Sequence, residues 1–421
     1  MSVNDSRAAR SRAATRPLPD ENSERPRRPR LLLVTDRVPA NDSGYSIRVN
    51  NVIRGLAQAG DLHVCLIDSS TGGESLPLDE GYDATVIRAE NPSPARKAVT
   101  GLVSLSQIPY RRHDTVRDAV AAQLGGESWD LVWFSRLRTY SVAKGLLDAP
   151  TIVDFDDLND QLGLSLIRDR IGRRGRVIAA PRNILGWLEA RRWRRLQADA
   201  SADVDRVVVC SAADQMIAGL HNSVVVPNGY GVPEPLPRAP DLDDPTIVFV
   251  GPLSYEPNRL AAEWLVFEVL PLLRRHEPRA RVCLVGYNHG ISRRITRTAG
   301  VDLVGYVRDL GPYYARAAVA VAPLHSGGGT RLKVIEAMAR SIPLVSTPLG
   351  CYGFDLRPGQ ELLVASDPQG FADACASIIR DPDVGRRLAS AGLRRYRDCF
   401  TADAASKSVA ALAAAVLEEA Q

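Results

Sequence analysis

Three consecutive glycines, Gly327–Gly329, lie in the part of the sequence best suited to chemistry. They follow an apolar run that ends at Pro323, and they precede a segment in which Leu332, Ile335 and Met338 recur at helical spacing. A glycine loop at a helix N-terminus offers unpaired backbone N–H groups and the positive end of the helix dipole. The pattern therefore predicts a phosphate-binding loop between a buried strand and a helix.

Four polar residues follow these glycines and extend the prediction. Thr330 is expected to cap the helix. Arg331 and Lys333 add two cations at the same helix end, and each could hold a phosphate; for Arg331 an ion pair with a nearby carboxylate is the alternative. Glu336 lies further along the helix, where a carboxylate can accept hydrogen bonds from a pair of hydroxyl groups.

A second candidate group is the acidic segment DFDDLND, which contains Asp154, Asp156, Asp157 and Asp160. It begins at the end of the predicted strand Thr151–Phe155, and α/β sheets bind ligands beyond the carboxyl ends of their strands. Like charges this close raise one another's pKa, which suits a general base. Asp156 and Asp157 are the catalytic candidates, with helix N-capping as the alternative role.

Alternating strand and helix signals predict an α/β fold. The run Leu31–Thr35 is a central parallel strand, a loop with Gly44 leads into an amphipathic helix, and His63–Ile67 is the next strand. A Pro- and Gly-rich stretch then precedes a second series that begins at Thr246–Val250. We therefore expect two doubly wound domains facing each other across a cleft.

The predicted boundaries divide the chain into five parts. Residues 1–29 are a disordered Arg- and Pro-rich tail, and residues 30–232 form the N-terminal domain. Residues 233–245 are a linker, and residues 246–399 form the C-terminal domain. Residues 400–421 form a last helix that packs back on the N-terminal domain.

Composition narrows the class of protein. The 421 residues carry a net charge of only +4, which gives no indication of nucleic-acid binding. No apolar run is long enough to span a membrane, and the first residues lack the apolar core of a secretory signal. The six cysteines form no ligand cluster, so neither a metal site nor a disulfide framework is expected. We expect a cytoplasmic protein.

Residues 168–206 are strongly basic and allow two interpretations. Trp187, Leu188, Trp193 and Leu196 alternate with arginines, which favours a helix with aromatic and cationic faces. The first interpretation is a surface helix packed on the domain. The second is peripheral contact with anionic lipid at the inner face of the membrane, or with an acidic acceptor.

Three segments resemble a known family: GGGTRLKVIEAMARSIPLVSTPLG at 327–350, VPNG at 226–229 and FVGPLSYEPNRLAAEWLVFEVLP at 249–271. The chain is similar in these segments to the GT-B glycosyltransferases of family 4, which are retaining and depend on nucleotide sugars. The resemblance covers most of the chain from Leu31 onward.

The resemblance implies roles for individual residues. Glu336 is similar to the second glutamate of an E-x7-E motif, which holds the ribose of the donor. The backbone N–H groups of four loop residues and the side chain of Lys333 would face the diphosphate. The four loop residues are Gly328, Gly329, Thr330 and Arg331. Tyr306 and Val307 match a loop that reads the nucleobase. Gly44 falls in the loop that approaches the diphosphate, and Asp156 falls where many members have an active-site histidine.

Two departures concern the donor sugar and phosphates. The first glutamate of the motif would fall at Gly328, so the loop has no carboxylate there. The arginine and lysine that many relatives carry after the first strand of the C-terminal domain have no counterpart in GPLSYEPN.

Together these features predict a glycosyltransferase that works without a metal or other cofactor and uses a nucleoside diphosphate sugar, with UDP and GDP as candidates. It would transfer the sugar to a hydroxyl of a glycan, a lipid-linked acceptor or a small molecule, in polysaccharide or glycoconjugate synthesis. The alternatives are a catalytically silent GT-B protein that binds a nucleotide or a partner transferase, and a sugar-nucleotide epimerase of the same fold.

Overall fold

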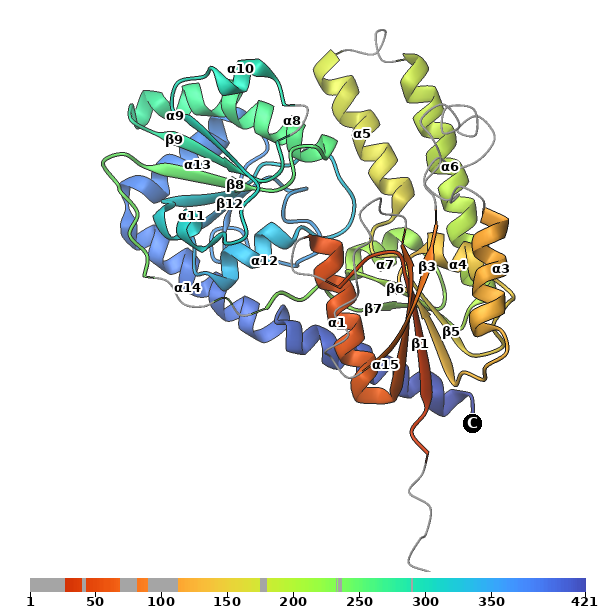
Figure 1. Cartoon of the computed structure of the whole chain (residues 1–421). Helices are drawn as coiled ribbons and strands as arrows, with labels where there is room; N and C mark the ends of the chain where they lie inside the picture. Colours follow the sequence, from red (N-terminus) through yellow and green to blue (C-terminus); the bar gives the residue numbers. More distant parts are fainter. Residues whose placement is uncertain are drawn as a thin grey trace, which may run out of the picture.

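The protein is described from a computed structural model, which covers residues 27–39, 43–68, 82–89, 113–174, 180–231, 233, 237–288 and 291–421. The expected tail, residues 1–29, lies outside the described residues except for its last three, and so do positions 234–236 of the expected linker. Figure 1 shows two α/β domains side by side, with the last helix lying beneath the N-terminal domain.

Within the described ranges the N-terminal domain contains a seven-stranded parallel sheet in the order β3-β2-β1-β4-β5-β6-β7. The strands are β1 Arg30–Thr35, β2 Asp61–Asp68, β3 Asp83–Arg88, β4 Leu131–Phe134, β5 Thr151–Asp154, β6 Arg206–Val209 and β7 Ser223–Val225. The helices are α1 Gly44–Ala59, α3 His113–Leu124, α4 Leu137–Ala143, α5 Asn159–Arg174, α6 Ala180–Asp203 and α7 Ala212–Ala218.

The continuous apolar runs form this sheet because both of its faces are covered. Leu31 and Leu33 pack into the core on the α1 side, whereas Leu32 and Val34 point into the core on the opposite face. Successive side chains of a strand alternate between faces, so a run without polar residues can only be a strand buried on both sides.

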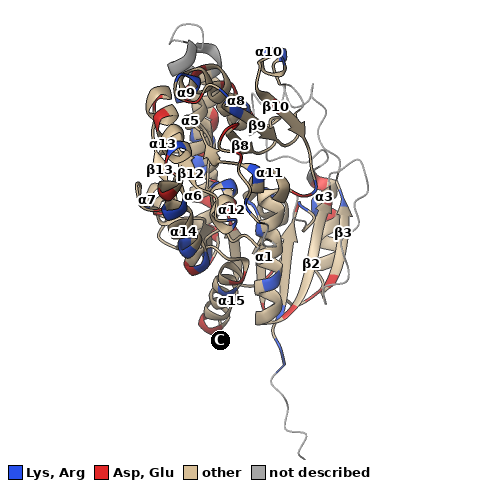
Figure 2. Cartoon of the chain, turned by 90° about the vertical axis from the view of Figure 1, so that its left-hand side faces the viewer, with Lys and Arg blue, Asp and Glu red and all other residues tan. Residues whose placement is uncertain are grey.

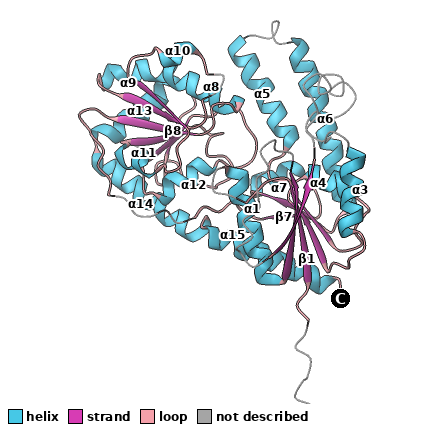
Figure 3. Cartoon of the chain, in the orientation of Figure 1, coloured by secondary structure: helices cyan, strands magenta, loops and turns pink. Residues whose placement is uncertain are grey.

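The described part of the C-terminal domain has a six-stranded parallel sheet in the order β10-β9-β8-β11-β12-β13. The strands are β8 Thr246–Val250, β9 Arg281–Val285, β10 Val301–Gly305, β11 Val319–Ala322, β12 Leu344–Ser346 and β13 Leu363–Val364. The helices are α8 Glu256–Trp264, α9 Leu270–His276, α10 Arg293–Thr296, α11 Gly311–Arg316, α12 Leu332–Ala339, α13 Pro368–Arg380 and α14 Pro382–Cys399. A π-helical turn, Leu265–Val269, joins α8 to α9. The two doubly wound domains predicted from the sequence are confirmed (Figure 3).

The chain crosses between the domains at two places that lie against each other. Tyr230 N donates to Phe400 O at 2.9 Å, and Ala402 N donates to Tyr230 O at 2.9 Å. After the second crossing, helix α15, Ala402–Glu419, packs on α1 in the N-terminal domain. The helices approach closely at Gly55, where an added Cβ would lie 2.5 Å from Ser406 O. Figure 2 shows acidic and basic residues interspersed along the helices of both domains.

Candidate active site

A cavity of about 760 Å³ lies between the domains, where the carboxyl ends of the two sheets face each other. From the N-terminal domain it is lined by the start of α1 and by the segments that follow β4 and β5. From the C-terminal domain it is lined by the segment after β8, the glycine loop and the first half of α12. Its volume falls in the range of small-molecule sites, about 300–1,000 Å³.

The glycine loop presents an uncapped helix end to this cavity. Gly327 and Gly329 have φ values of 138° and 60°, which only glycine adopts without strain. The prediction that Thr330 caps the helix is wrong: the N-cap is Arg331, and its side chain makes no capping bond. The Thr330 hydroxyl instead accepts a hydrogen bond from Asn228 Nδ2 at 2.8 Å. The first N–H groups of α12 therefore keep their capacity to bind an anion.

Arg331 supports the loop that precedes it. Its Nη1 donates to the carbonyl oxygens of Gly328 and Gly329, and the residue is 8% exposed. Among the described residues, Nε and Nη2 of Arg331 have no hydrogen-bond partner. The guanidinium thus fixes the loop and retains donors that an anion could use.

Lys333 reaches from α12 to the segment after β8. Its Nζ donates to Asn258 Oδ1 at 2.7 Å and lies 4.3 Å from the centre of the Phe249 ring. An added Cβ at Gly251 would lie 3.0 Å from Nζ. Burial, and then repulsion from Arg331, lower the pKa of Lys333 to about 7. The structure thus places a cation against the GPLSYEPN segment, which itself carries none.

Glu336 is 5% exposed and lines the cavity. Its carboxylate accepts hydrogen bonds from the hydroxyls of Tyr230 at 2.7 Å and Tyr314 at 3.3 Å, and Arg340 lies 3.7 Å away. Burial raises the pKa of Glu336 despite these partners. A carboxylate has about four acceptor sites, so capacity remains for ligand hydroxyls.

The predicted nucleobase residues lie elsewhere. Tyr306 and Val307 follow β10 and do not line the 760 Å³ cavity. Tyr306 is 46% exposed and stacks on Tyr287, with ring centroids 4.6 Å apart. The structure thus leaves an exposed aromatic pair at the ends of β9 and β10, outside the main cavity.

The acidic segment divides into residues with different surroundings. Asp154 is buried, and Arg48 of α1 binds it through two nitrogen–oxygen pairs at 2.7 and 2.9 Å. Asp160 pairs with Arg194 at 3.2 Å. These two carboxylates hold α1 and α6 in place, and only Asp156 and Asp157 of the segment's acidic residues line the cavity.

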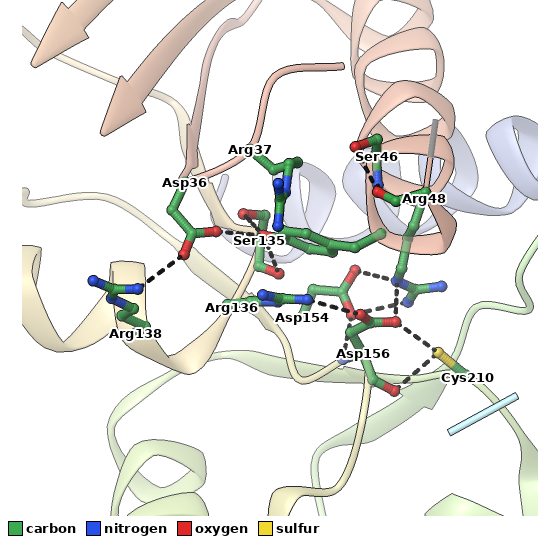
Figure 4. A network of polar contacts seen from close by, with 12 residues as sticks. Asp36, Arg37, Ser46, Arg48, Ser135, Arg136, Arg138, Asp154, Asp156 and Cys210 are labelled. Atoms are coloured by element: carbon green, nitrogen blue, oxygen red, sulfur yellow. Dashed lines mark hydrogen bonds and ion pairs between the residues drawn. The ribbon is translucent and has the colours of Figure 1, made fainter. Parts of the chain in front are cut away.

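Asp156 is held by cations from two directions, as Figure 4 shows. Its carboxylate oxygens lie 3.8 Å from Arg48 Nε and 3.7 Å from Arg136 Nη2. Its φ of 53° is rare for a residue with a side chain, and its N–H donates to Asp154 Oδ1 at 2.9 Å. The Cys210 thiol donates to Asp156 O at 3.0 Å.

Asp157 has a different environment. Its carboxylate faces the glycine loop of the other domain. Burial, and then repulsion from Asp156, raise its pKa to about 7, and Arg331 and Arg136 oppose this rise. A carboxyl group with a pKa near neutrality can act as a general base or as a hydrogen-bond partner in either protonation state.

The cavity also contains several residues of the N-terminal domain that were not among the candidates predicted from the sequence. The Arg136 guanidinium lies 3.3 Å from the centre of the Tyr45 ring, and the Tyr45 hydroxyl donates to Asp36 at 3.0 Å. Asp36 and Arg136 follow β1 and β4, so the rule that selected the acidic segment could have found them too. Trp193 of α6 also lines the cavity and had been assigned only to a helix surface.

All six cysteines are free, and four of them are buried. No described helix has the length and hydropathy needed to cross a membrane. In the described part of the chain, no three His, Cys, Asp or Glu residues are grouped as metal ligands.

Comparison with known proteins agrees with this architecture. Residues 244–381 match the family model described as glycosyl transferases group 1. A mannosyltransferase of Mycobacterium leprae that acts on phosphatidyl-myo-inositol, by its name, is 29% identical over 212 residues, which are 46% of this chain and 55% of that protein. An uncharacterized 44.6 kDa protein from the cps region of Klebsiella pneumoniae is 26% identical over 31% of this chain and 36% of its own length. The chain thus matches about half of the curated relatives' length or less.

Solved structures match over nearly the whole chain. Sucrose-phosphate synthase from Thermosynechococcus elongatus superposes with a TM-score of 0.71 at 19% identity, covering 93% of this chain and 100% of that one. The Anabaena protein HepE, in complex with UDP and glucose, gives 0.65 at 14% identity and covers 92% and 100%. Residues 244–381 thus match a glycosyltransferase group 1 domain, and the two-sheet architecture of the whole chain is that of the GT-B fold.

Proposed function

We propose that the protein transfers a sugar from a nucleoside diphosphate sugar to a hydroxyl of an acceptor. The observation that carries this proposal is the uncapped N-terminus of α12, which has Arg331 and Lys333 beside it and the buried Glu336 further along the same helix. This arrangement suits a diphosphate joined to a sugar with free hydroxyls. The match of residues 244–381 to the group 1 family model and the UDP bound in the structurally similar HepE support the same function.

In this proposal the donor lies along the C-terminal side of the cavity. The diphosphate contacts the N–H groups of Gly328–Arg331, and Lys333 supplies a charge. Glu336 accepts hydrogen bonds from the ribose, and the nucleobase extends out of the cavity toward Tyr306 and Val307. Gly44 lies opposite: an added Cβ there would be 3.2 Å from Leu332 Cδ1, so a side chain would hinder the approach of α1 to α12.

Charge stabilisation is the main requirement of the reaction. The leaving nucleoside diphosphate gains negative charge as the glycosidic bond breaks, and fixed positive groups lower the barrier. The helix end, Arg331 and Lys333 are such groups, so we propose that the reaction needs no divalent cation. Asp156 and Asp157 are the candidates for contact with the reacting sugar and the acceptor hydroxyl, and retention of configuration follows from the family resemblance alone.

The acceptor lies on the N-terminal side of the cavity in this proposal. Arg136, Tyr45 and Trp193 line that side and offer a cation, a hydroxyl and apolar surface. Such a mixture suits a glycan, a lipid-linked acceptor or a small hydroxylated molecule. A hydroxyl acceptor is the shared chemistry of all three.

We also propose that helix α6 contacts the inner face of the membrane. Ile184, Leu185, Trp187 and Leu188 are 42–60% exposed, a cluster of large apolar side chains that is unusual at a surface. Figure 1 shows α5 and α6 packed together and rising from the N-terminal sheet, with α5 on the side of the C-terminal domain and α6 behind it. The acyl region would take up these apolar side chains.

Arginines continue the outward face of α6. At 100° per residue, Arg191 and Arg195 follow Ile184 and Leu188 along one side of the helix, and Arg191 lies over the Trp187 ring at 5.2 Å. The step from Ile184 to Arg191 is about 10 Å along the helix axis, so the apolar residues and the arginines occupy successive turns. The arginines would then meet anionic headgroups while the apolar residues insert.

Vesicle sedimentation tests this membrane contact. The protein should pellet with phosphatidylcholine vesicles that contain phosphatidylglycerol and less with phosphatidylcholine alone, and Trp187→Ser with Leu188→Ser should abolish pelleting. The control is Met216→Ser with Ile217→Ser on α7, an apolar pair that is more exposed than Trp187 and Leu188. The proposal would be refuted if both double variants lost pelleting equally, or if the wild type pelleted equally well with neutral and anionic vesicles.

A donor panel tests the transferase proposal. Purified protein is incubated with UDP-glucose, UDP-N-acetylglucosamine or GDP-mannose and a cell extract that supplies acceptors, and the released UDP or GDP is measured. Release that depends on the extract and is lost in Glu336→Gln supports transfer. Tight binding without release supports the silent GT-B alternative, and a changed sugar without release supports an epimerase.

A further inference from the structure

The glycine loop has no side chain at Gly328, yet a carboxylate lies over that position. It belongs to Asp157, which comes from the other domain after β5. An added Cβ at Gly328 would be 3.6 Å from Asp157 Cβ and 3.6 Å from Asp157 Cγ. Asp157 Oδ1 also occupies the space that a Cβ at Gly329 would need. The two residues line the same cavity.

We propose that Asp157 is the residue that binds the hydroxyls of the donor sugar, in place of a carboxylate on the glycine loop. The inference rests on the proposed function, because it assumes that the diphosphate lies on this loop. A sugar joined to that diphosphate has to extend into the space beside Gly328. Asp157 is the carboxylate that the structure presents there.

The Asp157 carboxylate is available for such a role. No donor among the described residues hydrogen-bonds to it, whereas Asp154 and Asp160 are held by Arg48 and Arg194. The charges that act on it are the like charge of Asp156 and then the opposite charges of Arg331 and Arg136. A partly buried carboxyl group without hydrogen-bond donors is poorly satisfied until a ligand supplies them.

Backbone geometry indicates that the loop could accept a side chain at one of the two positions only. Gly329 has φ of 60° and is closed to other residues, but the φ of Gly328 lies outside the left-handed region. The contacts that crowd position 328 are Leu162 Cβ at 3.2 Å and Asp157 itself. A glutamate at 328 and an aspartate at 157 would therefore compete for one space, and one carboxylate can stand in for the other.

The origin of Asp157 in the N-terminal domain has a further consequence. In the proposed function the C-terminal domain alone would bind the nucleotide, but the sugar would be bound only when both domains close on it. Binding of the nucleotide sugar then depends on the closed cleft, whereas binding of the free nucleotide does not depend on it.

Calorimetry with matched ligands separates these roles. UDP and UDP-glucose, and GDP and GDP-mannose, are titrated into the wild type, Asp157→Ala, Gly328→Glu and the double variant. For the pair that the wild type binds, Asp157→Ala should weaken the nucleotide sugar ~10- to 100-fold, the usual effect of losing hydrogen bonds to a charged group. The free nucleotide should keep its affinity within about twofold.

The exchange of positions gives the sharpest result. Gly328→Glu alone should weaken nucleotide-sugar binding, because it sets two carboxylates in one space. In the Asp157→Ala background the same substitution should restore binding at least about tenfold, so its effect changes sign. Asp199→Ala, an exposed aspartate on α6, is the control for lost charge. Thermal melting verifies that each variant folds. If Asp157→Ala does not fold, Asp157→Asn is used in its place.

Each outcome decides between the two claims. Equal weakening of nucleotide and nucleotide sugar in Asp157→Ala would show that Asp157 only holds the domains together, and it would overturn the inference. Unchanged binding of both, or no rescue by Gly328→Glu, would also overturn it while leaving the proposed function intact. If the wild type binds none of the four ligands, the proposed function itself fails.

Discussion

Removal of the Lys333 charge is the perturbation whose size can best be worked out from the structure. The variant Lys333→Met keeps most of the side-chain volume and its contact with the Phe249 ring but removes the ammonium group 2.7 Å from Asn258. If the diphosphate binds at the end of α12, this variant should bind UDP or GDP more weakly. Lys407→Met, at an exposed lysine of α15, is the matched control.

Two terms set the magnitude. At ~4 Å and an effective dielectric constant of about 20, one phosphate charge and an ammonium attract by about 4 kcal/mol. At pH 8 the free lysine, with its pKa of about 7, is mostly neutral, and charging it costs about 1.4 kcal/mol. The difference, about 2–3 kcal/mol, corresponds to a loss of affinity of ~30- to 150-fold.

The lowered pKa adds a second and independent signal. Because an anion favours the charged lysine, nucleotide binding at pH 8 should draw nearly one proton from the buffer. Titration calorimetry in phosphate and in Tris, which differ in ionisation enthalpy, measures this uptake. A loss of affinity below about threefold in Lys333→Met, or proton uptake that persists in that variant, would refute the reasoning.

Three further outcomes follow from the same geometry. The pKa of Asp157 in the folded protein, about 7, exceeds its ordinary value of 3.8, so between these pH values the native state holds a proton that the unfolded chain releases. The free energy of unfolding should therefore fall as pH rises from 4 to 7. Thermal melts of Asp157→Asn should show a flatter dependence on pH. Gly44→Val should obstruct the approach of α1 to Leu332 and lower transfer at least about tenfold while melting stays within a few degrees, whereas a matched change at exposed Gly126 should have no effect. Nucleotide release by the wild type should survive EDTA, and loss of release that Mg²⁺ restores would contradict the metal-independent proposal.

The sequence predicts those parts of the fold and site that depend on local patterns. Runs such as Leu31–Thr35 have one stable outcome, a strand covered on both faces. The glycine loop and the spacing of Leu332 and Ile335 define strand, loop and helix within a few residues of one another, and the structure has all three. Phosphate-binding capacity is a local property, which is why it could be inferred.

Contacts between distant residues could not be predicted in this way. Thr330 was expected to cap α12, but Asn228 of the domain crossing binds its hydroxyl from 102 positions earlier. Lys333 finds Asn258 from 75 positions away, and Asp157 meets Gly328 only because the two domains face each other. These pairs depend on how the sheets are set against one another, and a local pattern carries no information about that.

The central claim is that α12 and its glycine loop hold a nucleoside diphosphate whose sugar is transferred. The most direct test incubates wild type and Glu336→Gln with a radiolabelled donor, UDP-glucose or GDP-mannose, and acceptor extract, and counts labelled product against released nucleotide. The account predicts equal amounts of the two in the wild type and a loss of both in Glu336→Gln. Product formation that Glu336→Gln leaves unchanged, or nucleotide release without labelled product, would contradict it.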